Sequence, residues 1–405
     1  MIDNNLIIKD YIQKKHFKDY INKRLSKKFN KIFLGIKDDV RNINRTLNVL
    51  DKKFKFNFKI KDLAKFKKFK AIVIIGMGGS ILGTEAIYGF LNKKIKKKVY
   101  FFNDLNEKKI QEIKKNEDFS KLLFIIVSKS GNTIETLFNT FSLNILKRNS
   151  KNVIIISEKK NNLLYSLCQN LNLYYIEHKH YIGGRYSVLS EVGIVPAYLM
   201  GINILNLRSK ILDIINEKNK FFLKNSTIKL LGFMKSKKIN NLVFLNYSPE
   251  LEKFLYWCQQ LIAESLGKKG GGFLPTISNA PKDHHSLLQL YLDGPRDKVF
   301  SIFSLEDKSK EKIQIKKSFG IKTFLNKKKF SLVKNAQKKA LIKVFIKEKI
   351  PFREFRIKTN NEETLGKLFS YFMIETVIFG KLLNINPFDQ PAVEQVKINT
   401  KQLLT

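Results

Sequence analysis

Short apolar runs rich in β-branched residues alternate along this chain with segments of helical periodicity, and this alternation is the strongest constraint on its fold. The runs of a first set each lead through a glycine or polar turn into a helix, and they span residues 71–75, 98–102, 122–127 and 152–156. A second set spans residues 242–245, 299–303 and 355–357. Strands that alternate with helices build parallel sheets covered by helices on both faces. The sequence therefore predicts an α/β protein with two doubly wound parallel-sheet domains.

Chain length supports more than one domain. The 405 residues exceed the size at which a single hydrophobic core stops growing. We expect a helical N-terminal arm at 1–60, a first sheet domain at 61–200, a helical linker at 201–235, a second sheet domain at 236–385 and a C-terminal helix at 386–405 that completes the functional site.

The formal net charge of +41 raises the question of a nucleic-acid or membrane partner. Lysine far outnumbers arginine and is scattered over the whole length, whereas proteins that follow phosphate backbones favour arginine forks and a dense basic stripe. Lysine is accompanied by much asparagine and isoleucine, whose codons are also rich in A and T. No apolar run approaches the roughly 18 residues of a membrane-spanning helix. We attribute the charge to genomic base bias and expect neither partner, although such a field would attract an anionic substrate.

Cysteine usage and the first residues indicate a cytoplasmic protein. The two cysteines, Cys168 and Cys258, are spaced neither as a disulfide framework nor as a metal-binding knuckle. The chain meets Asp3 before any apolar stretch typical of a secretory signal can form.

A glycine-rich loop follows the first predicted strand. Residues 71–75 run directly into Gly76-Met-Gly-Gly-Ser-Ile-Leu-Gly83 and then into a helical pattern. A strand, a glycine turn and a helix N-terminus together direct backbone N–H groups and the helix dipole at one point, which favours an anion. The spacing differs from the GxGxxG pattern of dinucleotide-binding loops. The loop indicates either an anion site or a tight turn without a ligand.

The strand at 122–127 leads into a second loop, Ser128-Lys-Ser-Gly-Asn-Thr-Ile-Glu-Thr136, which also opens a helix. Hydroxyl groups, backbone amides and Lys129 come together there. The loop lacks the GK[ST] sequence and the acidic metal ligands of a polyphosphate site, so it suits a single phosphate. Serine and threonine also cap helices without any ligand. We favour the phosphate interpretation.

These two loops resemble those of the sugar isomerase (SIS) fold. Residues 183–193, Gly-Gly-Arg-Tyr-Ser-Val-Leu-Ser-Glu-Val-Gly, resemble one signature of the glucose-6-phosphate isomerase family, and residues 388–397, Phe-Asp-Gln-Pro-Ala-Val-Glu-Gln-Val-Lys, resemble the other. Between them, residues 263–268 and 285–290 follow in the expected order. The resemblance implies two SIS domains with a phosphosugar between them, and a reaction without metal or cofactor.

The resemblance implies that Glu264 is the base that moves a proton between C2 and C1. This residue lies in the last turn of a helix predicted at 249–266, where the dipole disfavours negative charge and strengthens a carboxylate as a base. Gln260 shares its helix face. Arg185 follows two glycines and is expected to stabilise an enediolate. An exposed surface glutamate and a buried structural arginine are the plainer alternatives.

Ring opening and phosphate binding are assigned by the same resemblance. His285 is expected to be the ring-opening acid, assisted by Lys397, while Glu135 orients the substrate or compensates the helix dipole. The phosphate would be held by Gly79, Ser80, Ser128, Lys129, Ser130, Thr133 and Gln390. Two departures from the family pattern are His284, where glutamine is usual, and Pro391-Ala392.

A metal site at the histidines is not favoured. Adjacent side chains such as His284 and His285 diverge in direction, and no third ligand is spaced nearby. His178 and His180 are expected to be structural. We expect no metal.

The sequence is therefore expected to encode an isomerase that interconverts glucose 6-phosphate and fructose 6-phosphate through a cis-enediol. In this family the histidine comes from a second subunit, so we expect a homodimer with shared active sites. One alternative is an enzyme that also accepts mannose 6-phosphate. Another is a non-catalytic SIS phosphosugar-binding regulator, which would lack Glu264, His285 and Lys397.

Overall fold

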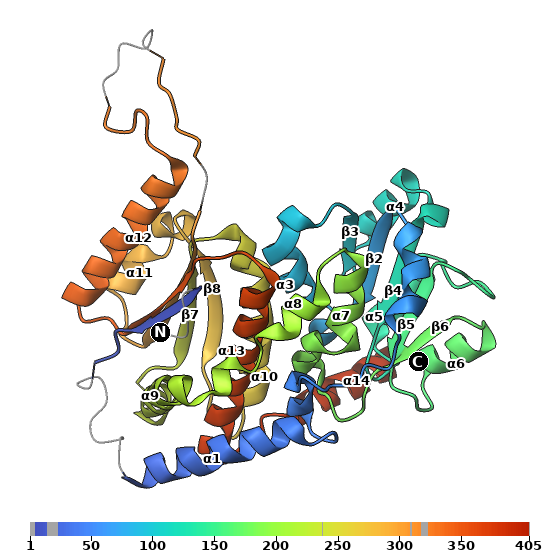
Figure 1. Ribbon diagram of the computed structural model, residues 1–405, viewed down its shortest axis with the longest axis horizontal. Coiled ribbons are helices and arrows are strands. Elements are labelled where there is room, and N and C mark those ends of the chain that lie inside the picture. Colours follow the sequence, from blue (N-terminus) through green and yellow to red (C-terminus); the bar gives the residue numbers. More distant parts are fainter. Residues whose placement is uncertain (1–4, 14–22, 237, 308–309, 317–322, 405) are drawn as a thin grey trace.

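The structure is a computed structural model that describes residues 5–13, 23–236, 238–307, 310–316 and 323–404 (Figure 1). It contains two five-stranded sheets with helices between and around them. The two sheets lie in the two halves of the elongated molecule, and the long helices α10 (Glu252–Leu266) and α13 (Glu362–Leu382) stand between them. The predicted α/β fold with two parallel-sheet domains is confirmed, and the exact domain boundaries stay a prediction.

The first sheet is fully parallel, with strand order β3-β2-β4-β5-β6. Its strands are Ala71–Gly76 (β2), Lys98–Phe102 (β3), Leu122–Val127 (β4), Val153–Ser157 (β5) and Tyr174–Glu177 (β6). Every residue of the central strands β2 and β4 is buried, as expected for a parallel sheet covered on both faces. The four predicted strands of this half are confirmed, and β6 was not predicted.

Helices follow the strands of this half in the expected alternation. They are Ile60–Ala64 (α2), Leu82–Leu91 (α3), Glu107–Asn116 (α4), Ile134–Ser142 (α5), Leu163–Asn170 (α6) and Glu191–Leu199 (α7). Asparagine side chains cap two of them: Asn106 accepts from Lys109 N and Asn162 accepts from Tyr165 N.

The second sheet has the order β8-β7-β9-β10-β1. Its strands are Asn241–Asn246 (β7), Leu274–Asn279 (β8), Lys298–Leu305 (β9), Phe352–Ile357 (β10) and Leu6–Asp10 (β1). The first four are parallel, whereas β1 pairs antiparallel with β10 and places Leu6 opposite Ile357.

Two strands of this sheet, β1 and β8, were not predicted. The predicted helical N-terminal arm contains helix α1, Lys23–Arg41, but Leu6–Asp10 is a strand, so the helical assignment is wrong there. β8 carries Pro275 and several polar residues and lies at the sheet edge, where a proline is tolerated. Its weak apolar pattern explains why it was not predicted.

The remaining α-helices come from the linker, the second half and the C-terminal segment. They are Ile204–Ser209 (α8), Glu217–Ser236 (α9), α10, Leu288–Leu292 (α11), Phe330–Lys347 (α12), α13 and Glu394–Leu404 (α14). α13 is buried along almost its whole length, whereas α14 buries none of its side chains.

One hydrophobic core joins the two halves. Ile72 and Ile74 of β2 belong to the same cluster as Phe244 of β7 and the buried face of α13. The alternate residues of β2, Val73 and Ile75, face a separate cluster on the outer side, as the two-residue period of a strand requires. Among the described residues, no helix has the length and apolar character needed to cross a membrane.

Candidate functional site

The glycine loop after β2 meets the loop that carries Arg185. Gly78–Ser80 forms a single 3-10 turn, and Gly184–Leu189 forms another. A Cβ added to Gly79 would lie 2.2 Å from the carbonyl carbon of Gly184, so the two backbones touch and only glycine fits. This contact places the first glycine loop directly beside the predicted enediolate-binding arginine.

Arg185 is the centre of a buried polar cluster. Its side chain is 2% exposed, and each of its five N–H groups has an acceptor. Nε donates to Ser265 Oγ at 2.8 Å, Nη1 to Glu264 Oε2 at 3.2 Å and Gln390 Oε1 at 2.8 Å, and Nη2 to the carbonyl oxygens of Pro387 at 2.7 Å and Asp389 at 2.9 Å. Arg185 is therefore both a structural arginine and a partner of the predicted base.

Glu264 lies two residues before the end of α10, as predicted, and its side chain is 29% exposed. Its second oxygen accepts from Gln260 Nε2 at 2.9 Å, one helical turn earlier. The amide nitrogen must face Glu264, because a carboxylate can only accept. The other amide atom, Gln260 Oε1, is buried and has no hydrogen-bond partner within the described part of the chain. Glu264 is thus held between a cation and an amide while part of its surface stays accessible.

The hydroxyl loop after β4 gathers its side chains as predicted. Ser128 Oγ lies 2.8 Å from Thr133 Oγ1, and Ser130 Oγ lies 3.4 Å from the same atom. Thr133 stands at the N-cap of α5, yet its hydroxyl makes no capping bond. The capping alternative is therefore wrong for Thr133, and the three hydroxyl groups form one cluster at the helix N-terminus.

Lys129 does not join this cluster. Its ammonium group donates to the carbonyl oxygen of His180 at 2.7 Å and lies 3.3 Å from Glu158. Burial lowers the pKa of Lys129, and Glu158 partly offsets this effect. Lys129 ties the loop to the segment after β6, which is a structural role that the sequence did not indicate. Glu135 lies half-buried in the first turn of α5.

The two adjacent histidines occupy different environments in the short helix Lys282–His285. His284 Nε2 lies 2.8 Å from the hydroxyl of Tyr247, and burial lowers the pKa of His284, with the neighbouring His285 adding to the effect. His285 is exposed. The departure from the family pattern at His284 is thus accommodated by a contact with Tyr247.

The C-terminal helix differs from its prediction. Gln390 lies before the helix, at the start of a 3-10 turn at Pro391–Val393, and bonds to Arg185. Lys397 lies on the exposed α14, with its ammonium group 2.6 Å from Glu394. The C-terminal helix was predicted from residue 386, but it begins only at Glu394, because Pro391 starts a separate turn, so Gln390 and Lys397 do not lie on one helix.

Further residues that sequence reasoning missed hold this cluster in place. Tyr186 Oη lies 3.0 Å from Ser265 Oγ, so the residue after Arg185 supports the acceptor of its Nε. Lys268 binds the C-terminal segment through the carbonyl oxygen of Asp389 at 2.7 Å and its carboxylate at 2.5 Å. Tyr186 and Lys268 both stand inside the predicted motifs, but their polar ends give no signal of these partners.

Metal-binding groups do not assemble in the described ranges: they hold no cluster of three or more histidine, cysteine, aspartate or glutamate side chains. Both cysteines are free and buried. The two doubly wound sheets and the polar cluster where the loops of the first half meet α10 of the second define a two-domain α/β protein of the SIS type.

The chain belongs to the phosphoglucose isomerase family, whose sequence profile matches residues 27–278. It is 33% identical over 356 residues to the "Probable glucose-6-phosphate isomerase" of Methanococcus maripaludis, covering 84% of this chain and 80% of that protein. Its fold is similar to a hypothetical protein of Thermus thermophilus, with a TM-score of 0.80 and 22% identity over 99% of this chain and 100% of the other. A glucose-6-phosphate isomerase from Chlamydia trachomatis superposes with a TM-score of 0.74 at 17% identity, over 99% and 88% of the two chains.

Proposed function

We propose that this protein interconverts glucose 6-phosphate and fructose 6-phosphate. The observation that carries the proposal is the 3.2 Å contact between the buried guanidinium of Arg185 and the carboxylate of Glu264, beside the glycine loop. Removing a proton next to a carbonyl needs a base and a fixed positive charge, because negative charge develops on oxygen as the proton leaves. Family membership and the name of the Methanococcus relative support the choice of sugar.

In the proposed reaction, Glu264 removes the proton from C2 of the open-chain aldose. The electron pair of that C–H bond forms the C1–C2 double bond of a cis-enediolate, and O1 takes up negative charge that Arg185 stabilises. Glu264 then returns the proton to C1 while the proton of the C2 hydroxyl passes to O1, so that O1 becomes a hydroxyl, O2 becomes the carbonyl oxygen and the ketose is formed. C2 is oxidised as C1 is reduced, so the reaction balances within one molecule and uses no cofactor.

Two further features support substrate binding beside Glu264. The unpartnered oxygen of Gln260 is available to accept from a sugar hydroxyl, which would satisfy a buried acceptor that is costly to leave unpaired. The hydroxyl cluster of Ser128, Ser130 and Thr133 lies at the N-terminus of α5 and suits a phosphate dianion. We assign the phosphate to this loop, together with Gly79, Ser80 and Gln390.

Ring opening is assigned to His285 and Lys397, and we infer that a second subunit brings them to the site. Both side chains are exposed, His285 on its short helix and Lys397 on α14. α14 also exposes apolar side chains, Val396 at 67% and Leu403 at 87%, that a partner subunit would cover. A homodimer with shared active sites follows, and light scattering during size exclusion would measure it. A monodisperse monomer with full activity would refute this part.

The cell compartment belongs to the same proposal. Free, buried thiols persist in a reducing cytoplasm, and both Cys168 and Cys258 are in this state. We infer a cytoplasmic enzyme.

The test couples fructose 6-phosphate conversion to NADP reduction by added glucose-6-phosphate dehydrogenase. The wild type should turn over, and Glu264→Gln should lower kcat by roughly 1,000-fold, because the amide cannot take up the proton. Glu112→Gln, on the exposed face of α4, is the matched control and should keep normal kinetics. An inactive wild type would refute the function, and an active Glu264→Gln would refute the assignment of the base.

The same assay separates the alternatives. A phosphosugar-binding regulator would bind fructose 6-phosphate without turnover. An enzyme with dual specificity would convert mannose 6-phosphate to fructose 6-phosphate and then to glucose 6-phosphate. The added dehydrogenase would then also reduce NADP when mannose 6-phosphate is the substrate offered.

A further inference from the structure

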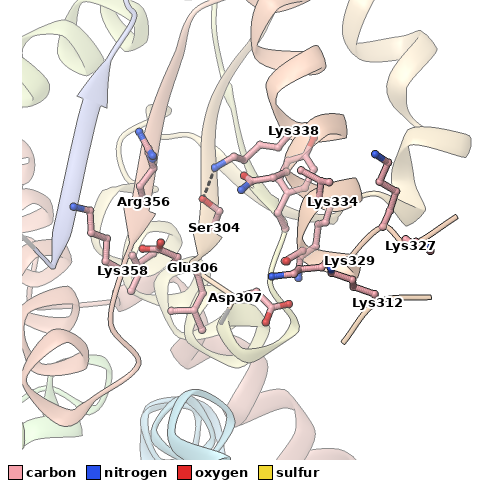
Figure 2. Close-up of a pocket in the computed structure, with 17 residues that line it drawn as sticks. Ser304, Glu306, Asp307, Lys312, Lys327, Lys329, Lys334, Lys338, Arg356 and Lys358 are labelled. Carbon is pink, nitrogen blue, oxygen red and sulfur yellow. Dashed lines mark hydrogen bonds between the residues drawn. The ribbon is translucent and has the colours of Figure 1, made fainter. Parts of the chain in front are cut away.

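A hollow of about 520 Å³ lies in the second half, apart from the Arg185 cluster (Figure 2). It is lined by the carboxyl ends of β7, β9 and β10, by the loop before α12 and by the first turns of α12. Its volume is in the range of small-ligand sites. None of the residues assigned to the isomerase reaction lines it.

The hollow concentrates positive charge well above the level of the chain. Eight of its seventeen lining residues are lysine or arginine, against 76 of 405 in the whole sequence. Two carboxylates, Glu306 and Asp307, also line it, so positive charge prevails by six. Base bias raises lysine everywhere and does not explain such a concentration in one concave place. Clefts lined by one sign of charge raise the local concentration of ligands of the opposite sign.

The place of the hollow in the fold is one where ligands bind. The strand order β8-β7-β9-β10 repeats the order β3-β2-β4-β5 of the first sheet, so the end of β9 corresponds to the end of β4. The end of β4 carries the hydroxyl loop. In doubly wound sheets, ligands bind outside the carboxyl ends of strands where the strand order reverses, which here is between β7 and β9. The hollow therefore occupies the position in the second sheet that the hydroxyl loop occupies in the first.

Helix α12 adds a second source of positive potential. It is 18 residues long, its first turn holds no acidic residue, and Lys329 stands at its N-cap, where the side chain has no acceptor to offer the first N–H groups. Ser331 and Lys334 of its first turns line the hollow. A helix N-terminus of this kind favours an anion.

The wall of the hollow holds a buried, fixed ammonium group. Lys338 of α12 is 7% exposed in its side chain, donates to Ser304 Oγ at 2.8 Å and lies 3.3 Å from Glu354. In Figure 2, Lys338 and Ser304 lie between the more exposed Arg356 and Lys358 on one side and Lys329 and Lys334 on the other. The cations thus approach from different elements around one space.

We propose that this hollow is a second anion site, which binds a small ligand carrying several phosphate groups. A single phosphate would use only a few of the eight cations, whereas two or three linked phosphates reach the groups of α12 and of β10 together. The limited volume favours a small molecule over a nucleic acid, whose backbone needs an open groove along its length. The site is independent of the proposed isomerase reaction.

The test uses inorganic tripolyphosphate as the probe and isothermal titration calorimetry as the measurement. The wild type should bind one tripolyphosphate per chain, and orthophosphate at least about tenfold more weakly. The double variant Lys334→Glu, Lys358→Glu should bind tripolyphosphate roughly 100-fold more weakly, because two attractive charges become repulsive. The matched control is Lys114→Glu, Lys115→Glu on the exposed end of α4, which changes the net charge equally and should alter the affinity less than about twofold.

The neutral pair Lys334→Gln, Lys358→Gln keeps the test valid if the charge reversal disturbs folding, and it should weaken binding by about tenfold. Absence of tripolyphosphate binding to the wild type would overturn the proposal. Equal weakening in the α4 control would also overturn it, because the binding would then follow net charge alone. A single-stranded oligonucleotide that binds more tightly than tripolyphosphate, and loses affinity in the Lys334 and Lys358 variants, would replace it with a nucleic-acid surface.

Discussion

The two sheets share one strand order but complete it differently. In the first sheet the fifth strand is β6, which follows β5 in the chain and runs parallel to it. In the second sheet the fifth place is taken by β1, which comes from the N-terminus and runs antiparallel to β10. The first half is thus assembled from one continuous segment, whereas the edge of the second half closes only when distant parts of the chain meet.

Although the two sheets are assembled differently, they share one hydrophobic core. Leu6 of β1 and Ile176 of β6 belong to the same hydrophobic cluster, which also contains Trp257 of α10. A residue at the edge of either sheet is therefore coupled through packing to the opposite half. We expect the two halves to unfold together, although their sheets are built differently.

The largest effect on stability is expected from Leu6→Ala. Leu6 is fully buried in the antiparallel edge strand, so the truncation should lower the free energy of unfolding by about 3 kcal/mol. Urea unfolding followed by circular dichroism and by the fluorescence of Trp257, the single tryptophan, should give coincident transitions.

Leu34→Ala on α1 is the control, because Leu34 is 57% exposed and its truncation should cost less than about 0.5 kcal/mol. If tryptophan fluorescence changed before the circular dichroism signal in Leu6→Ala, the halves would unfold separately and the shared core would not couple them.

The difference between the sheets also shows which strands are predictable from sequence. Strands such as Leu122–Val127 are continuous apolar runs, because helices bury both their faces, and such runs are visible without an alignment. β1 is five residues long with its last two partly or fully exposed, and its partner strand β10 lies near the other end of the chain. Its identity as a strand depends on that partner, and local pattern carries no information about it.

The next effect is a pH dependence located in the first half. His178, after β6, is fully buried, and burial lowers its pKa to about 4, with the nearby Lys129 adding to the effect. In the unfolded chain the pKa of His178 is about 6.5, so below this pH the unfolded chain binds a proton that the folded chain does not bind. The free energy of unfolding therefore falls with pH until the pH drops below the lower pKa of the folded chain. The free energy of unfolding should therefore be about 2 kcal/mol lower at pH 5 than at pH 7 because of His178. Urea unfolding of His178→Gln at the two pH values should lack this contribution.

His284 of the second half provides the comparison. Its pKa is also lowered, but its ring is only half-buried and contacts Tyr247, so His284→Gln should remove a smaller part of the pH dependence. Equal effects from the two substitutions would show that burial in the first half is not the cause.

A smaller effect, on the binding of substrate, is expected from Ser128→Ala. It tests whether the first half binds the phosphate while the second half carries the base. The first half supplies the hydroxyl cluster and the second supplies Glu264, so removal of the Ser128 hydroxyl should raise KM for fructose 6-phosphate about tenfold while kcat changes less than about twofold. Ser209→Ala on the exposed part of α8 is the control and should leave both constants unchanged. A fall in kcat at constant KM would move Ser128 from phosphate binding into the chemical step.

Side-chain positions in the site could be predicted where local helical spacing determines them. They could not be predicted where contacts between distant segments determine them. Glu264 and Gln260 could be placed together because helical spacing alone puts them one turn apart. The engagement of Lys129 by His180 could not be foreseen, because it depends on how the segment after β6 returns to the loop. The start of the C-terminal helix depends on the turn that Pro391 begins, so the helix starts at Glu394 and not at the predicted residue 386.

The smallest effect is expected from Gly35→Ala in α1, the helix of the N-terminal arm that packs against α13 of the second half. An added Cβ at Gly35 meets no atom within 4 Å, and alanine is favoured over glycine in a helix, so the free energy of unfolding should rise by up to about 1 kcal/mol. Because α1 and Trp257 contribute to one core, the gain should shift the urea midpoints of circular dichroism and tryptophan fluorescence equally. A shift in only one of the two signals would show that the arm stabilises its own helix alone, and the continuous first half would then be stable without it.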